Sequence, residues 1–483
     1  MTNGSFIDSQ STSGVRKCWH EEFNYIYVFN LRGNKRTLGE KSLQEGAPIF
    51  GSGSRVSIAI TLLVKDGSDN HKIYYHDIGD YLSRASKLSI ISKFKSINGI
   101  DWTEIEPDYN NDWINIRDIS YEKFLSMDGD FFLDRAIGVS TNRDVWVYSF
   151  SKKNLKITVH RLIENFNSEV MRLSSIANVK EKLKSINTSP EFIKWSDGFK
   201  TKLKNENTII PEDEKIIISM YRPFNKKFLY YQPDVIERPS RYKDFFGNNN
   251  KVIYITGSGA SRDFSCLMID SIPNLHLMDT GQGFYWKNNS KNLSNLNLST
   301  IDKLGLSEDE SLYYVYGILH SSEYREKYKN DLIKSLPRIP ILKNKEKYIE
   351  VGRQLANLHL NYESVPPYEG VEVIYKTSNP SYKVTKMKHP RRGVLDTIVF
   401  NHDITITNIP EKAYEYIVNG KSAIEWIIDQ YQVKTDKKSC ITDDPNLYSE
   451  NEKYIFNLLL SIINVSVQTV DLVNSLPPLE IEE

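Results

Sequence analysis

The chain has few cysteines, and none of them is paired. Cys18, Cys266 and Cys440 lie far apart in 483 residues, and no CxxC pair occurs. That spacing argues against a disulfide scaffold and against a zinc site, and it fits a reducing cytosol. The nine histidines add no HExxH string and no close pair of ligands. The sequence therefore predicts no metal site.

A net charge and a membrane-spanning run are missing as well. The chain has 62 Lys and Arg against 62 Asp and Glu, so a surface that attracts nucleic acid has to be a local patch. The uninterrupted apolar runs are shorter than a membrane span, and no charged-then-apolar leader opens the chain. We expect a cytoplasmic protein without a membrane partner.

Three strings imitate catalytic motifs, and each fails on chemistry or context. FGSGS at 50–54 resembles a cofactor loop, yet it precedes a predicted strand instead of following one. VPPY at 365–368 has no hydrogen-bond acceptor at its first position and is predicted to be a proline turn that ends a helix. GKS at 420–422 has Glu415 where a phosphate loop needs glycine, and it predicts a turn before a helix capped by Ser422. We therefore assign no catalytic, cofactor-binding or metal-binding residue.

The hydrophobic pattern predicts a mixed α/β chain with several domains. Residues 1–66 are expected to form a strand, a helix over 13–23, a strand over 25–31, a long polar loop and a strand over 57–64. A sheet that opens this way is expected to lack its first strands. Further along we expect a strand over 146–150, lysine-rich helices over 154–205, strands and turns over 215–290, and a last helix over 451–474.

Several unusual strings occur in a fixed order. They include TNGSFID, YVFNLRGNKRTLGE, GVSTNRDVWVYSF, YRPFNKKFLYY, HLMDTGQGFYW and NGKSAIEWIIDQYQVKTDKKSC. From Thr2 to Pro478 the chain resembles the C-terminal portion of the type ISP restriction–modification enzymes. Those enzymes carry nuclease, helicase-like ATPase, adenine methyltransferase and target-recognition regions in one polypeptide. Cys440 stands where the family pattern has glycine, which puts only a local turn in doubt.

The resemblance implies a truncated Rossmann-type methyltransferase sheet followed by a mixed α/β DNA-specificity region. Residues 1–85 would be the end of a γ-type adenine methyltransferase domain, 86–205 a partly helical coupler, and 206–483 the target-recognition region. The family's S-adenosylmethionine loop and catalytic NPPY motif precede this portion. No cofactor is therefore expected in this chain, and S-adenosylmethionine is expected in the complete enzyme.

The function implied is recognition of a specific double-stranded DNA site, without catalysis by the isolated chain. A partner is also expected, namely an upstream polypeptide with the methyltransferase core, ATPase and nuclease, unless the chain is a fragment of a broken gene. Two alternatives stay open. One is an adenine-specific methyltransferase subunit completed in trans, and the other is a protein-interaction module that no longer binds DNA.

Candidate DNA contacts follow from charge and side-chain geometry. Phosphates attract Lys and Arg, whereas base edges need planar donor and acceptor groups. The phosphate candidates are Arg222, Lys226, Lys227, Arg238, Arg241, Lys243, Lys383, Lys386, Lys388, Arg391 and Arg392. The base-reading candidates are Asn142, Arg143, Arg262 and Gln282, and Tyr285 is a candidate aromatic contact. Each basic run could equally be a solvated surface, and each base reader could equally fasten a loop to the core.

Overall fold

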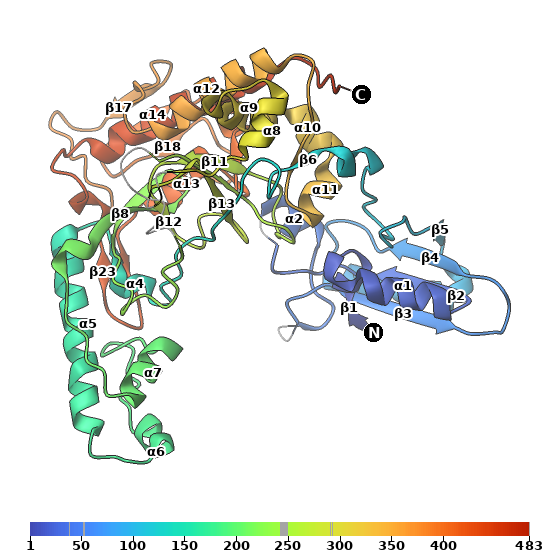
Figure 1. Cartoon of the computed structure of the whole chain (residues 1–483), viewed down its shortest axis with the longest axis horizontal. Helices are drawn as coiled ribbons and strands as arrows, with labels where there is room; N and C mark the ends of the chain where they lie inside the picture. Colours follow the sequence, from blue (N-terminus) through green and yellow to red (C-terminus); the bar gives the residue numbers. More distant parts are fainter. Residues whose placement is uncertain (38, 52–53, 242–249, 290, 292, 483) are drawn as a thin grey trace. The chain divides into compact units, whose positions relative to one another are not determined.

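The computed structural model describes residues 1–37, 39–51, 54–241, 250–289, 291 and 293–482. The chain forms two compact units, each containing helices and small sheets (Figure 1). Unit 1 comprises residues 1–127, 256–264 and 323–341, and unit 2 comprises residues 128–255, 265–322 and 342–483. The fold is therefore mixed α/β, and both units are assembled from segments that are distant in the sequence.

Unit 1 is built on a five-stranded sheet with the order β1-β3-β2-β4-β5. Its strands are β1 (Thr2–Asn3), β2 (Tyr25–Asn30), β3 (Ile58–Val64), β4 (Lys72–Asp77) and β5 (Thr103–Ile105). Strand β2 is parallel to β4 and antiparallel to β3 along its whole length. On the opposite side of β3, the two residues of β1 pair only with Ile58 and Ala59.

Each face of this sheet has its own apolar core. On one face Ile26, Val28 and Ile73 pack with Trp19 and Phe23 from helix α1 (Ser13–Glu22) and its end. The other face packs side chains such as Phe29 against helix α3 (Arg84–Phe94). Strand alternation thus buries both faces, as expected for a sheet between helical layers. The short helix α2 (Gly39–Gln44) lies in the loop between β2 and β3.

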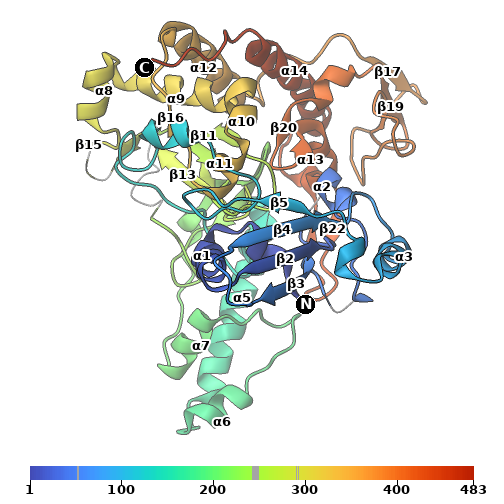
Figure 2. The ribbon, with the colours of Figure 1, turned by 90° about the vertical axis from the view of Figure 1, so that its right-hand side faces the viewer.

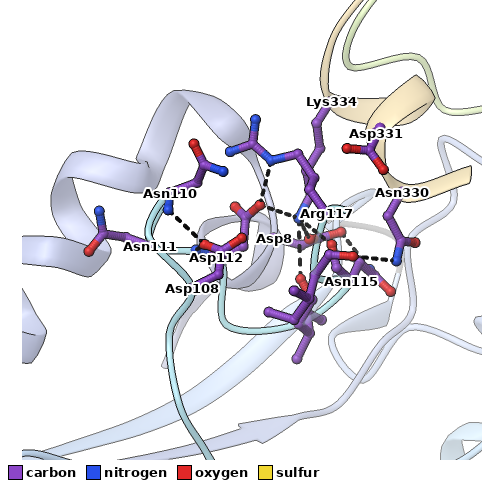
Figure 3. A network of polar contacts seen from close by, with 12 residues as sticks. Asp8, Asp108, Asn110, Asn111, Asp112, Asn115, Arg117, Asn330, Asp331 and Lys334 are labelled. Carbon is purple, nitrogen blue, oxygen red and sulfur yellow. Dashed lines mark hydrogen bonds and ion pairs between the residues drawn. The ribbon is translucent and has the colours of Figure 1, made fainter. Parts of the chain in front are cut away.

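The rest of unit 1 comes from far along the chain. Strand β16 (Arg338–Ile339) pairs with β6 (Leu125–Ser126), and helices α10 (Ser322–Lys327) and α11 (Lys329–Lys334) precede it. Lys334, only 3% exposed, lies 3.1 Å from the Asp112 carboxylate. That carboxylate, 1% exposed, also accepts a 2.9 Å hydrogen bond from Arg117 (Figure 3) and another of 2.9 Å from Arg16. We call these four residues the Asp112 cluster. It ties α11 to the loop after β5.

Unit 2 contains several small sheets. A four-stranded sheet has the order β12-β8-β9-β7, and a three-stranded sheet has the order β11-β10-β13. Their strands are β7 (Tyr148–Ser149), β8 (Ile216–Arg222), β9 (Asn225–Tyr230), β10 (Val252–Ile255), β11 (Cys266–Ile269), β12 (Ile272–Pro273) and β13 (Gln282–Tyr285). A second three-stranded sheet contains β17 (Glu372–Tyr375), β18 (Ile398–Val399) and β19 (Ile404–Thr407). Two-stranded hairpins are β14 (Lys287–Asn288) with β15 (Leu293–Ser294), β20 (Ile417–Val418) with β21 (Lys421–Ser422), and β22 (Lys434–Thr435) with β23 (Thr442–Asp443).

Helices α5 (Lys152–Leu173), α6 (Val179–Lys184) and α7 (Asp197–Lys204) form an arm of unit 2 that both views show extending from its sheets (Figures 1 and 2). Helix α4 (Asp144–Val147) leads into this helical arm. Further helices of unit 2 are α8 (Leu298–Leu304), α9 (Glu308–His320), α12 (Lys345–Leu360), α13 (Ala423–Gln430) and α14 (Tyr454–Asn474). Of the described helices, α14 is the one long and apolar enough to cross a membrane, but 67% of its most apolar window is buried within the protein.

Two glycines let α9 and α12 touch through their backbones. A Cβ atom at Gly317 would lie 2.3 Å from the carbonyl oxygen of Tyr348, and one at Gly352 would lie 2.0 Å from that of Tyr313. Any larger residue would push the helices apart, because packed interiors leave no room for an extra methyl group at such distances. This crossing is a rigid part of unit 2.

Most predicted elements are present, with two corrections. The strand expected over 146–150 is wrong at its start, because Trp146 and Val147 end helix α4 and only Tyr148 and Ser149 pair with β9. The predicted proline turn at 365–368 does not end the helix, since α12 stops earlier, at Leu360. The turn and helix predicted at 420–422 are confirmed: Ser422 caps α13 in a capping box with Glu425.

Candidate nucleic-acid interface

The most accessible candidates lie in residues 383–392, here called the basic segment. Its backbone joins the β17-β19-β18 sheet, since Lys388 and Val399 exchange two hydrogen bonds of 3.1 and 2.8 Å. The five cations of the segment are exposed, and no described carboxylate forms an ion pair with any of them. These cations are Lys383, Lys386, Lys388, Arg391 and Arg392. Because these cations are exposed and form no ion pair with a described carboxylate, their charge is available to an anionic partner.

The candidates in the β8–β9 hairpin are bound to the protein itself. The Lys226 ammonium lies 2.6 Å from Glu363, and the Lys227 ammonium lies 2.8 Å from Asp443. Both side chains are little exposed, at 13% and 12%. Burial lowers the pKa of Lys227, and the Asp443 charge opposes that shift. This pairing favours a structural role for both lysines.

Arg222 is engaged in the same hairpin. Its guanidinium stacks 4.0 Å from the ring centre of Tyr221 and donates a 2.9 Å hydrogen bond to the side chain of Asn274. A base-reading or phosphate-binding role would require these contacts to be shared or exchanged. Arg222 is therefore less available for binding than the cations of the basic segment, and among the described residues it forms no ion pair as Lys226 and Lys227 do.

One extended segment, residues 134–143, brings several distant candidates close to each other. Ser140 exchanges backbone hydrogen bonds of 3.0 and 2.8 Å with Arg238, and Asp134 binds Arg241 at 2.5 Å. Gln282 accepts a 2.6 Å hydrogen bond from Arg135. Arg238 is exposed, and Arg241 has 64% of its side chain exposed despite its ion pair. Sequence reasoning missed Arg135, because only the fold places it beside Gln282.

Asn142 and Arg143 follow directly, and they differ sharply in exposure. Asn142 is exposed, with a left-handed backbone at φ 59°. Arg143 is only 3% exposed. Its guanidinium lies 3.4 Å from the Phe199 ring centre and donates hydrogen bonds to the Val235 carbonyl and to Ser196. Burial lowers the pKa of Arg143 to about 9, so the group stays charged at neutral pH.

The remaining candidates are divided between the units. Tyr285 is 1% exposed and belongs to the core of unit 2, so its ring packs against protein. Arg262 is half-buried and belongs to unit 1. Lys243 lies outside the described residues, as do Ser52 and Gly53 of the FGSGS string. All assignments of individual residues to phosphates or bases remain predictions.

Comparisons with known proteins agree on one family. The model of the type ISP C-terminal specificity domain matches residues 130–458. The chain belongs to the type ISP specificity-domain family. The resemblance drawn from the sequence is thereby confirmed. The domain boundaries expected at 85 and 205 remain predictions, although the matched region includes the helical arm.

Solved structures extend the similarity over the whole chain. A nuclease-deletion mutant of the type ISP restriction–modification enzyme LlaGI, in complex with a DNA substrate mimic, is 49% identical with a TM-score of 0.92 over 99% of this chain. The ATP-dependent type ISP enzyme LlaBIII bound to DNA is 40% identical with a TM-score of 0.89 over 100% of this chain. DrdV, in a complex with DNA, is 26% identical with a TM-score of 0.85 over 99% of this chain.

The chain is much shorter than these relatives. It spans 39% of the LlaGI chain, 32% of the LlaBIII chain and 50% of the DrdV chain. Among curated proteins no match is found.

Proposed function

We propose that this type ISP specificity-domain protein binds double-stranded DNA and recognises a target site, and that it is catalytically incomplete alone. The family match carries the proposal, together with three similar structures that were each solved with DNA or a DNA mimic. The basic segment supports it independently, because five exposed cations without ion pairs are concentrated in a chain with no net charge.

The basic segment would supply affinity rather than sequence discrimination. Lysine and arginine contacts to phosphates release condensed counterions, so each contact steepens the dependence of affinity on salt. Target recognition would instead fall to polar side chains along residues 134–143 and their neighbours, among them Asn142 and Gln282. Asn142 lies on a loop, where recognition residues are commonly found, and Gln282 begins strand β13.

A charge-removal experiment tests this division. The variant Lys386→Gln, Lys388→Gln, Arg391→Gln and Arg392→Gln should bind every duplex more weakly. The slope of log affinity against log salt should fall in magnitude by about 3 to 4, because each lost phosphate contact removes about 0.9. Fluorescence anisotropy with labelled duplexes at several salt concentrations measures both quantities.

The matched control removes four exposed cations elsewhere that form no described ion pair. These cations are Lys93, Lys123, Lys303 and Lys343. The control should keep the parent slope. If the parent chain ignores duplex DNA at low salt, the proposed function is wrong and the protein-interaction alternative gains.

We propose further that the unit 1 sheet is the last part of a γ-type adenine methyltransferase sheet, and that an upstream polypeptide completes it. The supporting observation is the unequal pairing of the two edges of β3. One edge pairs with β2 along the full length of that strand, whereas on the other edge β1 pairs only with Ile58 and Ala59. Among the described residues, 60–64 have no ladder partner on the β1 side of the strand. An unpaired edge of this kind favours strand addition.

The second proposal implies methylation only in the presence of that partner. The complete enzyme would use S-adenosylmethionine, and the isolated chain would transfer no methyl group. Radiolabelled methyl transfer to adenine should appear when a polypeptide with the methyltransferase core, ATPase and nuclease is co-expressed. Methylation by the isolated chain would refute the proposal, and failure to co-purify with such a polypeptide would favour a gene fragment.

A further inference from the structure

A cleft lies where the helical arm joins the rest of unit 2. Its volume is about 490 Å³, and it is bounded by residues 142–146 at the start of α4, by the arm segment 186–200 and by the turn of the β22–β23 hairpin. We call it the arm cleft. Asn142 and Arg143 were already candidates from the sequence, but the cleft itself was not expected, because its walls come from three separate stretches of the chain.

Positive charge predominates in the arm cleft. Lys194 and Lys438 are exposed and form no ion pair with a described carboxylate. Lys200 has only a 4.0 Å contact with Asp197, whose side chain is 96% exposed, and a pair of that kind contributes little. Three cations are thus free to bind an anion.

The two acidic residues of the arm cleft are engaged in local structure. Asp436 accepts hydrogen bonds of 3.1 and 2.8 Å from the backbone amides of Lys438 and Ser439, and the Ser439 bonds lower its pKa. Asp144 accepts hydrogen bonds from Thr141 and Asn274. Both carboxylates therefore shape the turns and keep their charge, and the cleft lining has four cations, Arg143 included, against these two anions.

The interior wall of the arm cleft adds a buried cation and two indole rings. Arg143, 3% exposed, lines the cleft, and its Nε has no hydrogen-bond partner among the described residues. Trp146 is 2% exposed and lies beneath the Arg161 guanidinium at 4.9 Å, and Trp195 also lines the cleft. A buried donor without a partner is costly unless a ligand or water satisfies it.

The whole arm is electropositive. Residues 152–204 contain twelve Lys and Arg against five Asp and Glu, a net charge of +7 in a chain whose formal charge is zero. Carboxylates outside the arm neutralise three of these cations, Lys156, Lys182 and Lys202. The remaining excess makes the arm cleft attractive to a polyanion.

We propose that the arm cleft binds backbone phosphates of DNA, as a second contact surface besides the basic segment. This inference rests on the proposed function. Lys194, Lys200 and Lys438 bind the phosphate oxygens, and the half-buried Trp195 ring packs against the sugar. Arg143 is a positioning residue, because its guanidinium joins Ser196 at the start of α7 to the Val235 carbonyl. The phosphate contacts of the three lysines carry no sequence information, whereas Asn142, which also lines the cleft, remains a candidate for reading bases.

The test compares two triple variants of the full chain. Lys194→Gln, Lys200→Gln and Lys438→Gln removes the cations of the arm cleft, and Lys180→Gln, Lys184→Gln and Lys204→Gln removes three exposed arm cations outside it. Each variant is titrated with a labelled duplex of random sequence over roughly 50 to 200 mM salt. Thermal melting by circular dichroism checks that both variants fold as the parent does.

The cleft variant should lose about 2 to 3 from the magnitude of the salt slope, and the control should keep the parent slope. Equal slopes in the two variants overturn the inference. A second outcome also contradicts the inference. If poly-glutamate displaces the duplex from the parent, and the cleft variant keeps the parent salt slope, the cleft binds an acidic protein instead. If the parent binds no duplex, the proposed function itself fails.

Discussion

The Asp112 cluster and the basic segment use the same residue types in opposite ways. In the cluster, Arg16, Arg117 and Lys334 have at most 8% of their side chains exposed, and one carboxylate faces all three. In the basic segment the cations are exposed, and no described carboxylate pairs with them. The comparison teaches that a cation's surroundings, not its type, decide whether it holds the fold together or remains available to a partner.

The energetics follow from desolvation. A buried cation has lost its water and depends on its carboxylate, so removal of that carboxylate leaves an uncompensated charge. An exposed cation keeps its hydration. Substitution of such a cation therefore hardly affects folding, but it weakens the attraction of the protein to a polyanion. Stability and DNA affinity should therefore respond to different substitutions.

The largest effect should come from the centre of the Asp112 cluster. Asp112→Ala should lower the free energy of unfolding by about 3 to 5 kcal/mol, because Arg16 and Arg117 lose their carboxylate partner, while Lys334 keeps Asp8 at 2.9 Å. Urea titration followed by tryptophan fluorescence measures this loss. Glu21→Ala, which breaks the exposed Lys17–Glu21 pair of 3.8 Å, should cost less than about 0.5 kcal/mol. Similar losses in both variants would contradict the comparison.

The next prediction sets a paired lysine of unit 2 against a free one. Lys227→Met should cost about 2 to 3 kcal/mol, because Asp443 loses a charged hydrogen bond in a poorly exposed site. Lys386→Met should change stability by less than about 0.5 kcal/mol. It should nevertheless lower the magnitude of the DNA salt slope by about 1. Denaturant titration measures the stability of both variants, and fluorescence anisotropy measures their DNA salt slopes. A larger stability loss in Lys386→Met than in Lys227→Met would contradict the comparison.

A smaller effect concerns Asp331, which lies beside the Asp112 cluster (Figure 3). Burial raises the pKa of Asp331 to about 6, above its unfolded value of 3.8, so its ionisation destabilises the fold as pH rises through 6. Asp331→Asn should therefore raise the melting temperature at pH 7.5. The gain should shrink on acidification and vanish below pH 3.8. Melting curves across this range test it, and a gain that is constant with pH would rule out the assignment.

The smallest expected effect is at Cys440, in the turn that borders the arm cleft. Its φ of 57° is left-handed, a conformation that glycine adopts without a steric cost. Cys440→Gly should stabilise the chain by about 0.5 to 1 kcal/mol, since the steric relief exceeds the added entropy of the unfolded state. Cys440→Ala keeps the left-handed cost and serves as the control. Equal stability of the two variants would show that the turn is not strained.

Elements set by local chemistry were predictable from the sequence. Helix α1, the Ser422 cap and helix α14 follow from apolar spacing and capping residues, and the structure has them. At Cys440 the departure from glycine put only a local turn in doubt, and the structure has a left-handed backbone there. In each of these cases the interactions lie within a few residues of one another.

The roles of the cations were not predictable, because they depend on distant partners. Lys226 pairs with a carboxylate 137 residues away, and Lys227 with one 216 residues away. Neither spacing leaves a signal in a single sequence. The arm cleft escaped notice for the same reason, although the lysine-rich helices were recognised. A charge count over that window would have shown the excess.

The crossing of α9 and α12 has a consequence for how specificity can change. At Gly317 and Gly352 the two backbones are already in contact, so the helix pair has no slack to absorb a substitution. The angle between these helices therefore cannot change without separating the two backbones. Substitutions should be better tolerated in residues 134–143 and 383–392. Gly317 and Gly352 should be retained in engineered variants.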